Sequence, residues 1–127
     1  MKFAIDTSAY SAAERDNPQV REWFAPNHHL LVPIIVIAEL HAGFANGRKQ
    51  RQNEDLLDEF LSSPYTDILH ITERTALLYA DIFTELRKAG RPINTNDMWI
   101  AALCIEHNLP LLTLDADFKN IKALNLL

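Results

Sequence analysis

The amino-acid sequence predicts an α/β fold in which a mostly parallel sheet is covered by helices on both faces. Short apolar runs that are typical of strands alternate with longer segments whose apolar residues recur at helical spacing. The strand candidates have no polar face, as expected of strands that are buried on both sides. With 127 residues, 48% of them hydrophobic, residues 1–127 have the length and apolar content of one packed domain.

The first strand and the first helix are marked by short local signals. Residues 3–5 form an apolar run, and Asp6 ends it with a side chain that favours a turn or a helix start. Asn17 followed by Pro18 is typical of an N-cap with proline at the first helical position. We therefore expect a strand and then a short helix that ends before Pro26.

A second strand and two longer helices come next. Residues 29–32 are the second strand, and Pro33 ends it because proline has no N–H group for the sheet. Pro33 also suits the first turn of a helix, which we expect over about residues 34–44. A further helix that Pro64 ends is predicted by a stripe of four apolar residues: Leu56, Leu57, Phe60 and Leu61.

The second half of the chain continues the alternation. Residues 68–71 are the third strand, and a long helix follows that opens at Thr72 and closes at Gly90. Its predicted apolar stripe consists of Ala76, Leu77, Ala80, Phe83 and Leu86. Residues 98–105 are nearly all apolar, so this helix is expected to be buried on most sides. Residues 111–114 are the fourth strand.

Composition and charge exclude several classes of protein. Twelve Lys and Arg against 17 Asp and Glu give a net charge of −5, so the chain is not a wholly basic nucleic-acid binder and must meet any polyanion at a local basic patch. The single cysteine, Cys104, can form no internal disulfide, and no Cys and His cluster predicts a structural zinc site. We expect a cytoplasmic location, because a chain with one cysteine suits a reducing compartment. We expect no membrane insertion, because no apolar run approaches the ~20 residues of a bilayer span.

Four acidic residues lie where the chemistry of such a fold is expected. Sites in open α/β sheets form beyond the carboxyl ends of the strands, and Asp6 and Asp115 follow the first and fourth strands. Asp97 opens an otherwise apolar helix, and Glu39 interrupts another. Buried carboxylates without partners are costly, so these acids together indicate a hard metal ion.

Each acid also has a purely structural explanation when it is taken alone. Asp6 and Asp97 suit helix caps, Asp115 suits a turn, and Glu39 can extend toward solvent. These explanations do not account for four acids at the places where separate elements converge. They also leave Glu39 without a Lys or Arg among its sequence neighbours.

The residues around the acids resemble the four acidic motifs of PIN domains. The matching strings are IDTS (5–8), VIAEL (36–40), NDMWIAA (96–102) and LTLDADF (112–118). Their order and spacing, and the length of the chain, are similar to those of the VapC-type ribonuclease toxins of type II toxin–antitoxin modules. The resemblance spans essentially the whole chain.

The resemblance implies a fold, a site and an activity. The fold is a three-layer one with a parallel sheet of order 3-2-1-4-5, in which the tail near residues 123–124 is the candidate for the fifth strand. The activity is that of an endoribonuclease toxin that is neutralised by an antitoxin protein, and a homodimer is implied as well. One Mg²⁺ or Mn²⁺ site is lined by Asp6, Glu39, Asp97 and Asp115, beside Thr7, Ser8, Asn96 and Asp117.

General chemistry agrees with such a site. Mg²⁺ keeps several water ligands, lowers the pKa of a bound water and screens charge on a phosphate, so no nucleophilic side chain is needed. The sequence accordingly has no Gly-x-Ser-x-Gly motif and no glycine-rich phosphate loop. Between the two neighbouring acids, we assign Asp115 as the ligand, because it follows Leu114 at the strand end, and Asp117 as the cap of a following helix.

Two basic clusters are candidate contacts for an RNA backbone, where positive charge would offset the repulsion from an acidic site. They consist of Arg48, Lys49 and Arg51, and of Arg87, Lys88 and Arg91. Solvated helix ends explain these cations equally well.

Two other functions fit a fold of this class. A phosphoryl-transfer domain of the haloacid-dehalogenase type would have a second Asp where Ser8 stands, and one of the receiver type would have a Lys where Asp115 stands. A non-catalytic binding module on the same fold is disfavoured by the intact set of four acids. The apolar stripes exceed what one sheet needs to cover, which favours a homodimer with a groove for the antitoxin.

Overall fold

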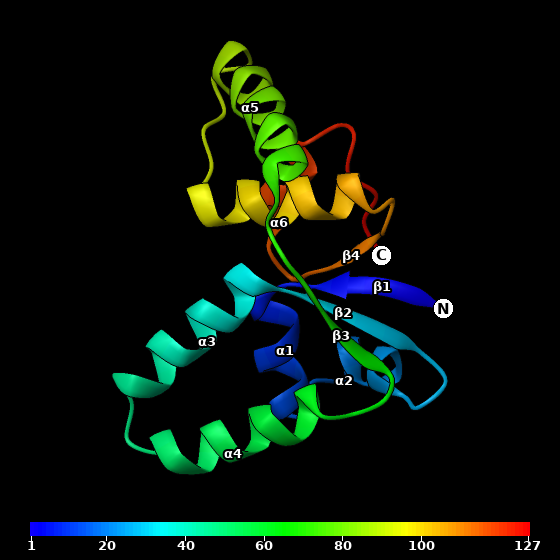
Figure 1. The fold of residues 1–127 in the computed structure, drawn as a ribbon, viewed down its shortest axis with the longest axis vertical. Helices are drawn as coiled ribbons and strands as arrows, with labels where there is room; N and C mark the ends of the chain where they lie inside the picture. The colour runs from blue at the N-terminus through cyan, green and yellow to red at the C-terminus, as the bar shows by residue number, and fades with distance from the viewer.

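A parallel four-stranded sheet lies at the centre of the computed structural model, which describes residues 1–127 (Figure 1). The strands are β1 (Lys2–Ile5), β2 (His29–Pro33), β3 (Thr66–Leu69) and β4 (Leu111–Leu112). Their order is β3-β2-β1-β4, as predicted for the first four strands, and every neighbouring pair is parallel. The central strand β1 is buried from Phe3 to Ile5.

Two groups of helices flank this sheet. In Figure 1, α1 to α4 lie on one side of β1, and α5 and α6 lie on the other. The first group comprises α1 (Thr7–Glu14), α2 (Pro18–Arg21), a 3₁₀ helix η1 (Glu22–Phe24), α3 (Ile34–Ala45) and α4 (Gln50–Leu61). The second group comprises α5 (Glu73–Lys88), α6 (Thr95–Glu106) and a 3₁₀ helix η2 (Ala116–Asn120). None of the helices is both long enough and apolar enough to cross a membrane.

The local helix signals locate the helix starts well. Asn17 caps α2 by accepting a hydrogen bond from the N–H of Gln19, and Pro18 is the first helical residue. The helix after Pro33 begins at Ile34, as predicted. Helix α6 is buried on most sides, with Met98 and every residue from Ile100 to Cys104 in the core.

The third and fourth strands differ from their predicted bounds. β3 begins two residues early, at Thr66, because the carbonyl of Tyr65 already accepts a hydrogen bond from the N–H of Leu30. β4 ends at Leu112 and not at residue 114, since the hydroxyl of Thr113 accepts a hydrogen bond from the N–H of Asp115 and turns the chain.

The fifth strand is reduced to one bridge, which lies later in the tail than residues 123–124. Leu126 forms a parallel bridge with Leu111 of β4. The N–H of Leu111 donates to the carbonyl of Asn125, and the N–H of Leu127 donates to the carbonyl of Leu111. The tail therefore occupies the fifth position of the sheet without forming a regular strand.

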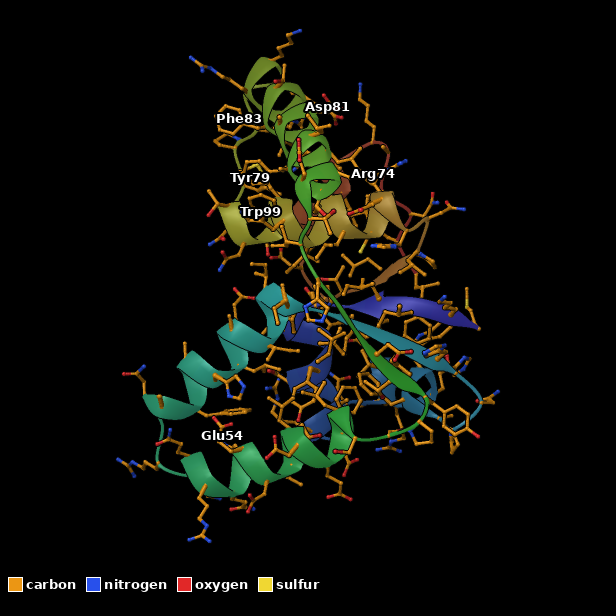
Figure 2. All side chains as sticks on the ribbon, viewed as in Figure 1. Glu54, Arg74, Tyr79, Asp81, Phe83 and Trp99 are labelled. Atoms are coloured by element: carbon orange, nitrogen blue, oxygen red, sulfur yellow. The ribbon has the colours of Figure 1, made fainter.

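Helix α5 turns a different face to the core than the sequence predicts. Leu77 and Phe83 of the predicted stripe are 67% and 45% exposed, and only Leu86 of that stripe is buried. The inward face carries Ile82 and Tyr79, and the ring of Tyr79 stacks on Trp99 of α6 with centroids 4.2 Å apart (Figure 2). These side chains are larger than the alanines of the predicted stripe, so burying them removes more apolar area from water.

The two adjacent leucines of α4 test how the core is built. Leu57 is fully buried, whereas Leu56 is 39% exposed. Leu57→Ala leaves a cavity and should lower the free energy of unfolding by about 3 kcal/mol. Leu56→Ala, the matched control, should cost about 1 kcal/mol or less, because little of its surface leaves water. Urea denaturation measures both, and equal losses would contradict this packing.

Candidate active site

The parallel strands bring the ends of β1 and β4 together at one edge of the sheet. Ile5 of β1 pairs with Leu112 of β4, so Asp6 and Thr113 follow at neighbouring positions. Glu39 comes from the middle of α3, and Asp97 from the first turn of α6. Asp115 is the N-cap of η2, just beyond β4. The four predicted acids therefore lie at the edge of the sheet where sites of α/β proteins form.

Asp6 is almost fully buried, with 4% of its surface exposed, and both of its carboxylate oxygens accept hydrogen bonds. Oδ1 accepts from the N–H of Ala9 at 2.9 Å, so Asp6 caps α1, and also from the hydroxyl of Ser8 at 2.7 Å. Oδ2 accepts from the hydroxyl of Thr113. Burial raises the pKa of Asp6, although these three hydrogen bonds favour its ionised form.

Two hydroxyl groups connect Asp6 to the chain that follows β4. The oxygen of Ser8 accepts a hydrogen bond from the N–H of Leu114 at 3.0 Å, and that of Thr113 accepts one from the N–H of Asp115 at 2.9 Å. Ser8 is one of the predicted site residues, but Thr113 was missed. The signal that could have revealed Thr113 is its hydroxyl directly after an apolar strand, in the position that Asp6 occupies after β1.

Glu39 connects three helices at the site. Its Oε1 accepts a hydrogen bond from the hydroxyl of Thr7 at 2.6 Å, and its Oε2 accepts one from the side-chain amide of Asn96 at 3.3 Å. Thr7 and Asn96 are thus in contact with an acid of the site, where the sequence places them. These bonds hold the Glu39 carboxylate in one orientation while leaving its charge unneutralised.

Asp97 is the acid without a partner. It is the third residue of α6, whose cap is Asn94, so capping does not explain it. Its carboxylate accepts no hydrogen bond from the chain and forms no ion pair. Burial, followed by the negative charges of Asp115, Glu39, Asp6 and Asp117 in that order, raises the pKa of Asp97 from 3.8 to about 6.

The capping role predicted for Asp117 belongs to Asp115. The carboxylate of Asp115 accepts a hydrogen bond from the N–H of Asp117 at 2.9 Å and so caps η2. The turn at Thr113 moves the start of η2 two residues closer to the strand than the sequence suggests. Asp115 is half-buried and raises the pKa of Asp97 more than the exposed Asp117 does.

The carboxylate oxygens of the site suit a hard metal ion that keeps several water ligands. No three His, Cys, Asp or Glu side chains lie close enough together to hold a metal ion by themselves. Mg²⁺ is instead usually bound through one or two carboxylates together with several waters. No Lys or Arg neutralises the acids, because every ion pair in the molecule is formed by a histidine. The carboxylate of Asp97, which has no partner in the protein, is the donor most open to such an ion.

The two predicted basic clusters are placed differently. Arg48, Lys49 and Arg51 lie exposed at the turn between α3 and α4. Figure 1 shows this turn at the end of α3 that points away from β1. The length of α3, 12 residues or about 18 Å, places the turn far from the start of the helix, and Glu39 lies about halfway along. In the other cluster all three residues are exposed, and Lys88 and Arg91 line an open cavity.

Removing the charge of Asp97 should stabilise the protein in the absence of metal. The raised pKa means that the folded state binds this proton more tightly than the unfolded state, so the contribution of Asp97 to stability falls as the pH rises from 3.8 through about 6. Asp97→Asn should therefore raise the free energy of unfolding at about pH 8, and the gain should shrink toward about pH 4.

Urea denaturation in a chelator at both pH values measures this effect. Asp117→Asn is the control, because its carboxylate is exposed and contributes least to the pKa of Asp97. A loss of stability in Asp97→Asn of the same size at both pH values would contradict the repulsion described here.

Comparison with known proteins identifies the family. The model of the PIN domain family matches residues 3–124. The ribonuclease VapC2 of Rickettsia felis is 35% identical over 126 residues, which cover 95% of this chain and 92% of that protein. The ribonuclease VapC1 of Haemophilus influenzae strain R2866 is 27% identical over 117 residues, which cover 89% of this chain and 86% of that protein.

Solved structures agree with these sequence matches. The structure of VapBC2 from Rickettsia felis bound to a DNA fragment from its promoter superposes with a TM-score of 0.86 and 31% identity, covering 100% of this chain and 98% of that chain. The structure of VapBC-1 from nontypeable Haemophilus influenzae gives a TM-score of 0.85 at 26% identity, covering 100% and 97%. The chain therefore belongs to the PIN-domain family, among the VapC ribonuclease toxins of toxin–antitoxin systems.

Proposed function

We propose that residues 1–127 form one nuclease domain that cuts RNA internally with the help of Mg²⁺ or Mn²⁺, and that the protein acts as the toxin of a type II toxin–antitoxin module. The observation that carries this proposal is the convergence of Asp6, Glu39, Asp97 and Asp115 without any basic side chain to pair with them. The buried, unpaired thiol of Cys104 suits a reducing cytoplasm.

The residues have separate tasks in this mechanism. Asp6, Glu39, Asp97 and Asp115 would hold the metal ion. The ion, when bound, lowers the pKa of an attacking water and screens the charge that develops on phosphorus. Thr113 and Ser8 donate to Asp6 and fix its carboxylate at the strand end. Thr7 and Asn96 fix Glu39, whose free lone pairs can then orient water.

The partners follow from the same family and from the exposed surface. The similar structures from Rickettsia felis and Haemophilus influenzae are of VapBC2 and VapBC-1, and a chain of the same fold from Klebsiella pneumoniae was solved in a toxin–antitoxin complex. In this chain an open groove of about 190 Å³ lies between α1, α3 and α4 and is lined by Tyr10, Phe44 and Leu56, among others. We propose this groove for the antitoxin, and the exposed apolar face of α5 for a second copy of the chain.

Purified protein that is free of its partner should cleave single-stranded or looped RNA in Mg²⁺ or Mn²⁺ and should be silenced by a chelator. Asp115→Asn keeps a capping oxygen for η2 but removes a negative ligand, so turnover should fall by about a hundredfold or more while the fold stays intact. Asp117→Asn, two residues on, is the matched control and should cleave nearly as well as the wild type.

Gel assays of RNA cleavage and titration with Mn²⁺ measure both variants. A loss confined to Asp117→Asn would reverse the assignment of the last acid, and full wild-type activity in chelator would end the metal mechanism.

The proposed dimer can be tested on α5. Leu77 and Phe83 are the exposed apolar residues of this helix, so replacing both with serine should convert a dimer into a monomer. Sedimentation in the micromolar range measures the change. Tyr65→Ser, which changes another exposed apolar residue on a different element, is the control and should leave the dimer intact. A wild-type monomer across this range would contradict the dimer.

A further inference from the structure

A basic cavity lies beside the acidic site and is not part of it. It has a volume of about 600 Å³ and opens between the C-terminal end of α5 and η2. Four cations line it: Lys88, Arg91, Lys119 and Lys122. Lys119 and Lys122 belong to neither basic cluster of the sequence, because they are far along the chain from Lys88 and come close to it only through the fold.

The four cations of this cavity form no ion pair with the protein. Glu85 is the one acid in its lining, and no Lys or Arg lies within ion-pair distance of it. Its carboxylate accepts the backbone N–H of Lys122 at 3.2 Å. Arg91 donates from Nη1 to the side-chain oxygen of Asn120 at 3.1 Å, which joins the two walls of the cavity. Four positive charges are therefore free to meet a polyanion, in a chain whose net charge is −5.

Both walls of the cavity continue directly into the acidic site. Arg91 precedes Asp97 by six residues, and Lys119 follows Asp115 by four. Lys119 also lines a smaller neighbouring cavity of about 280 Å³ together with Thr113 and Asp115. Since η2 has five residues at about 2 Å each, only about 10 Å separates the start of this helix from its end at the basic cavity.

We propose that this basic cavity binds the phosphates of the RNA substrate on one side of the bond that is cut, with Lys119 at the junction to the site. The inference rests on the proposed function, since it names a binding surface for the same substrate. Four acids repel an RNA backbone, and adjacent cations that release its counterions offset that repulsion. A flexible single strand can run from Asp115 along η2 into the cavity.

The lining favours RNA over an acidic segment of a protein partner. Protein interfaces have an apolar centre with aromatic anchors, whereas Ala89 is the one hydrophobic residue in this cavity. A surface of four cations, one amide and one acid has an excess of positive charge and suits a chain of phosphates and ribose hydroxyls. The apolar groove between α1, α3 and α4 lies elsewhere and shares no residue with the basic cavity.

Binding is measured separately from cleavage by placing the test variants in an Asp97→Asn background. The double variant Lys119→Gln/Lys122→Gln removes two positive charges and is compared with Lys2→Gln/Arg74→Gln, which removes two exposed charges that line neither the basic cavity nor its smaller neighbour. Arg74 lies at the start of α5, opposite the end that carries Lys88 (Figure 2). The probe is a fluorescently labelled single-stranded RNA whose anisotropy is followed at several salt concentrations.

The cavity variant should lose on the order of tenfold in RNA affinity near 0.1 M salt, and its salt dependence should weaken by about 1.4 in log–log slope. The control should change affinity less than about twofold. With Asp97 intact, the cavity variant should raise KM for long RNA and leave kcat nearly unchanged, because these lysines touch no reacting atom.

Several outcomes would overturn this inference. Equal losses in both double variants would indicate general attraction by charge, and unchanged RNA affinity in the cavity variant would remove the cavity from the RNA path. Loss of antitoxin binding with RNA affinity retained would assign the cavity to the protein partner. A wild-type protein that cleaves no RNA would refute the proposed function, whereas the binding comparison would still decide the role of the cavity.

Discussion

The mutual repulsion of four carboxylates is the constraint on which the rest of this structure depends. Asp97 has no partner, and burial together with the charges of the other acids raises its pKa to about 6. Such an arrangement lowers stability, so packing elsewhere has to offset it. The continuous core of β1 and α6, which is closed to solvent from Phe3 to Ile5 and from Ile100 to Cys104, supplies that packing directly beneath the site.

The site is held together by neutral donors and not by cations. Ser8 and Thr113 donate to Asp6, and Thr7 and Asn96 donate to Glu39. A lysine or arginine in their place would bind the carboxylates just as firmly but would cancel the charge that a metal ion requires. Hydroxyl and amide groups fix the orientation of the acids and leave the charge available. This choice of donors favours the metal mechanism over a site whose acids serve only to stabilise the fold.

The sequence predicts features that depend on nearby residues better than features that depend on distant ones. Asn17 with Pro18, and Pro33, locate the starts of α2 and α3 because a helix start is decided within a few residues. The end of β4 depends on Thr113, whose hydroxyl contacts Asp6, a residue 107 positions away in the sequence. No local pattern contains that contact, so the strand was predicted two residues too long and the cap of η2 was given to Asp117.

Helix α5 illustrates the same limit for burial. Its sequence has apolar residues on more than one face, and the face that is buried is the one whose Tyr79 stacks on Trp99 of α6. The spacing of apolar residues does not tell which face is buried, because that depends on the helix that packs against α5. The four acids were easier to find, since each breaks or ends an apolar segment and is conspicuous without knowledge of its neighbours. Thr113 is not conspicuous in that way, because threonine is common in strands.

The two ends of η2 lie in regions of opposite charge. Asp115 begins this helix at the acidic site, and Asn120 ends it at the basic cavity, where it holds Arg91. A polyanion near this surface experiences repulsion at one end of η2 and attraction at the other, so its position is decided by the balance between them. A metal ion at the acids would shift that balance toward the site by neutralising part of its charge. The turn at Thr113 thus determines two distances. One is the distance between Asp115 and Asp97, and the other is the distance from the lysines on and after η2 to the acids whose charge they offset.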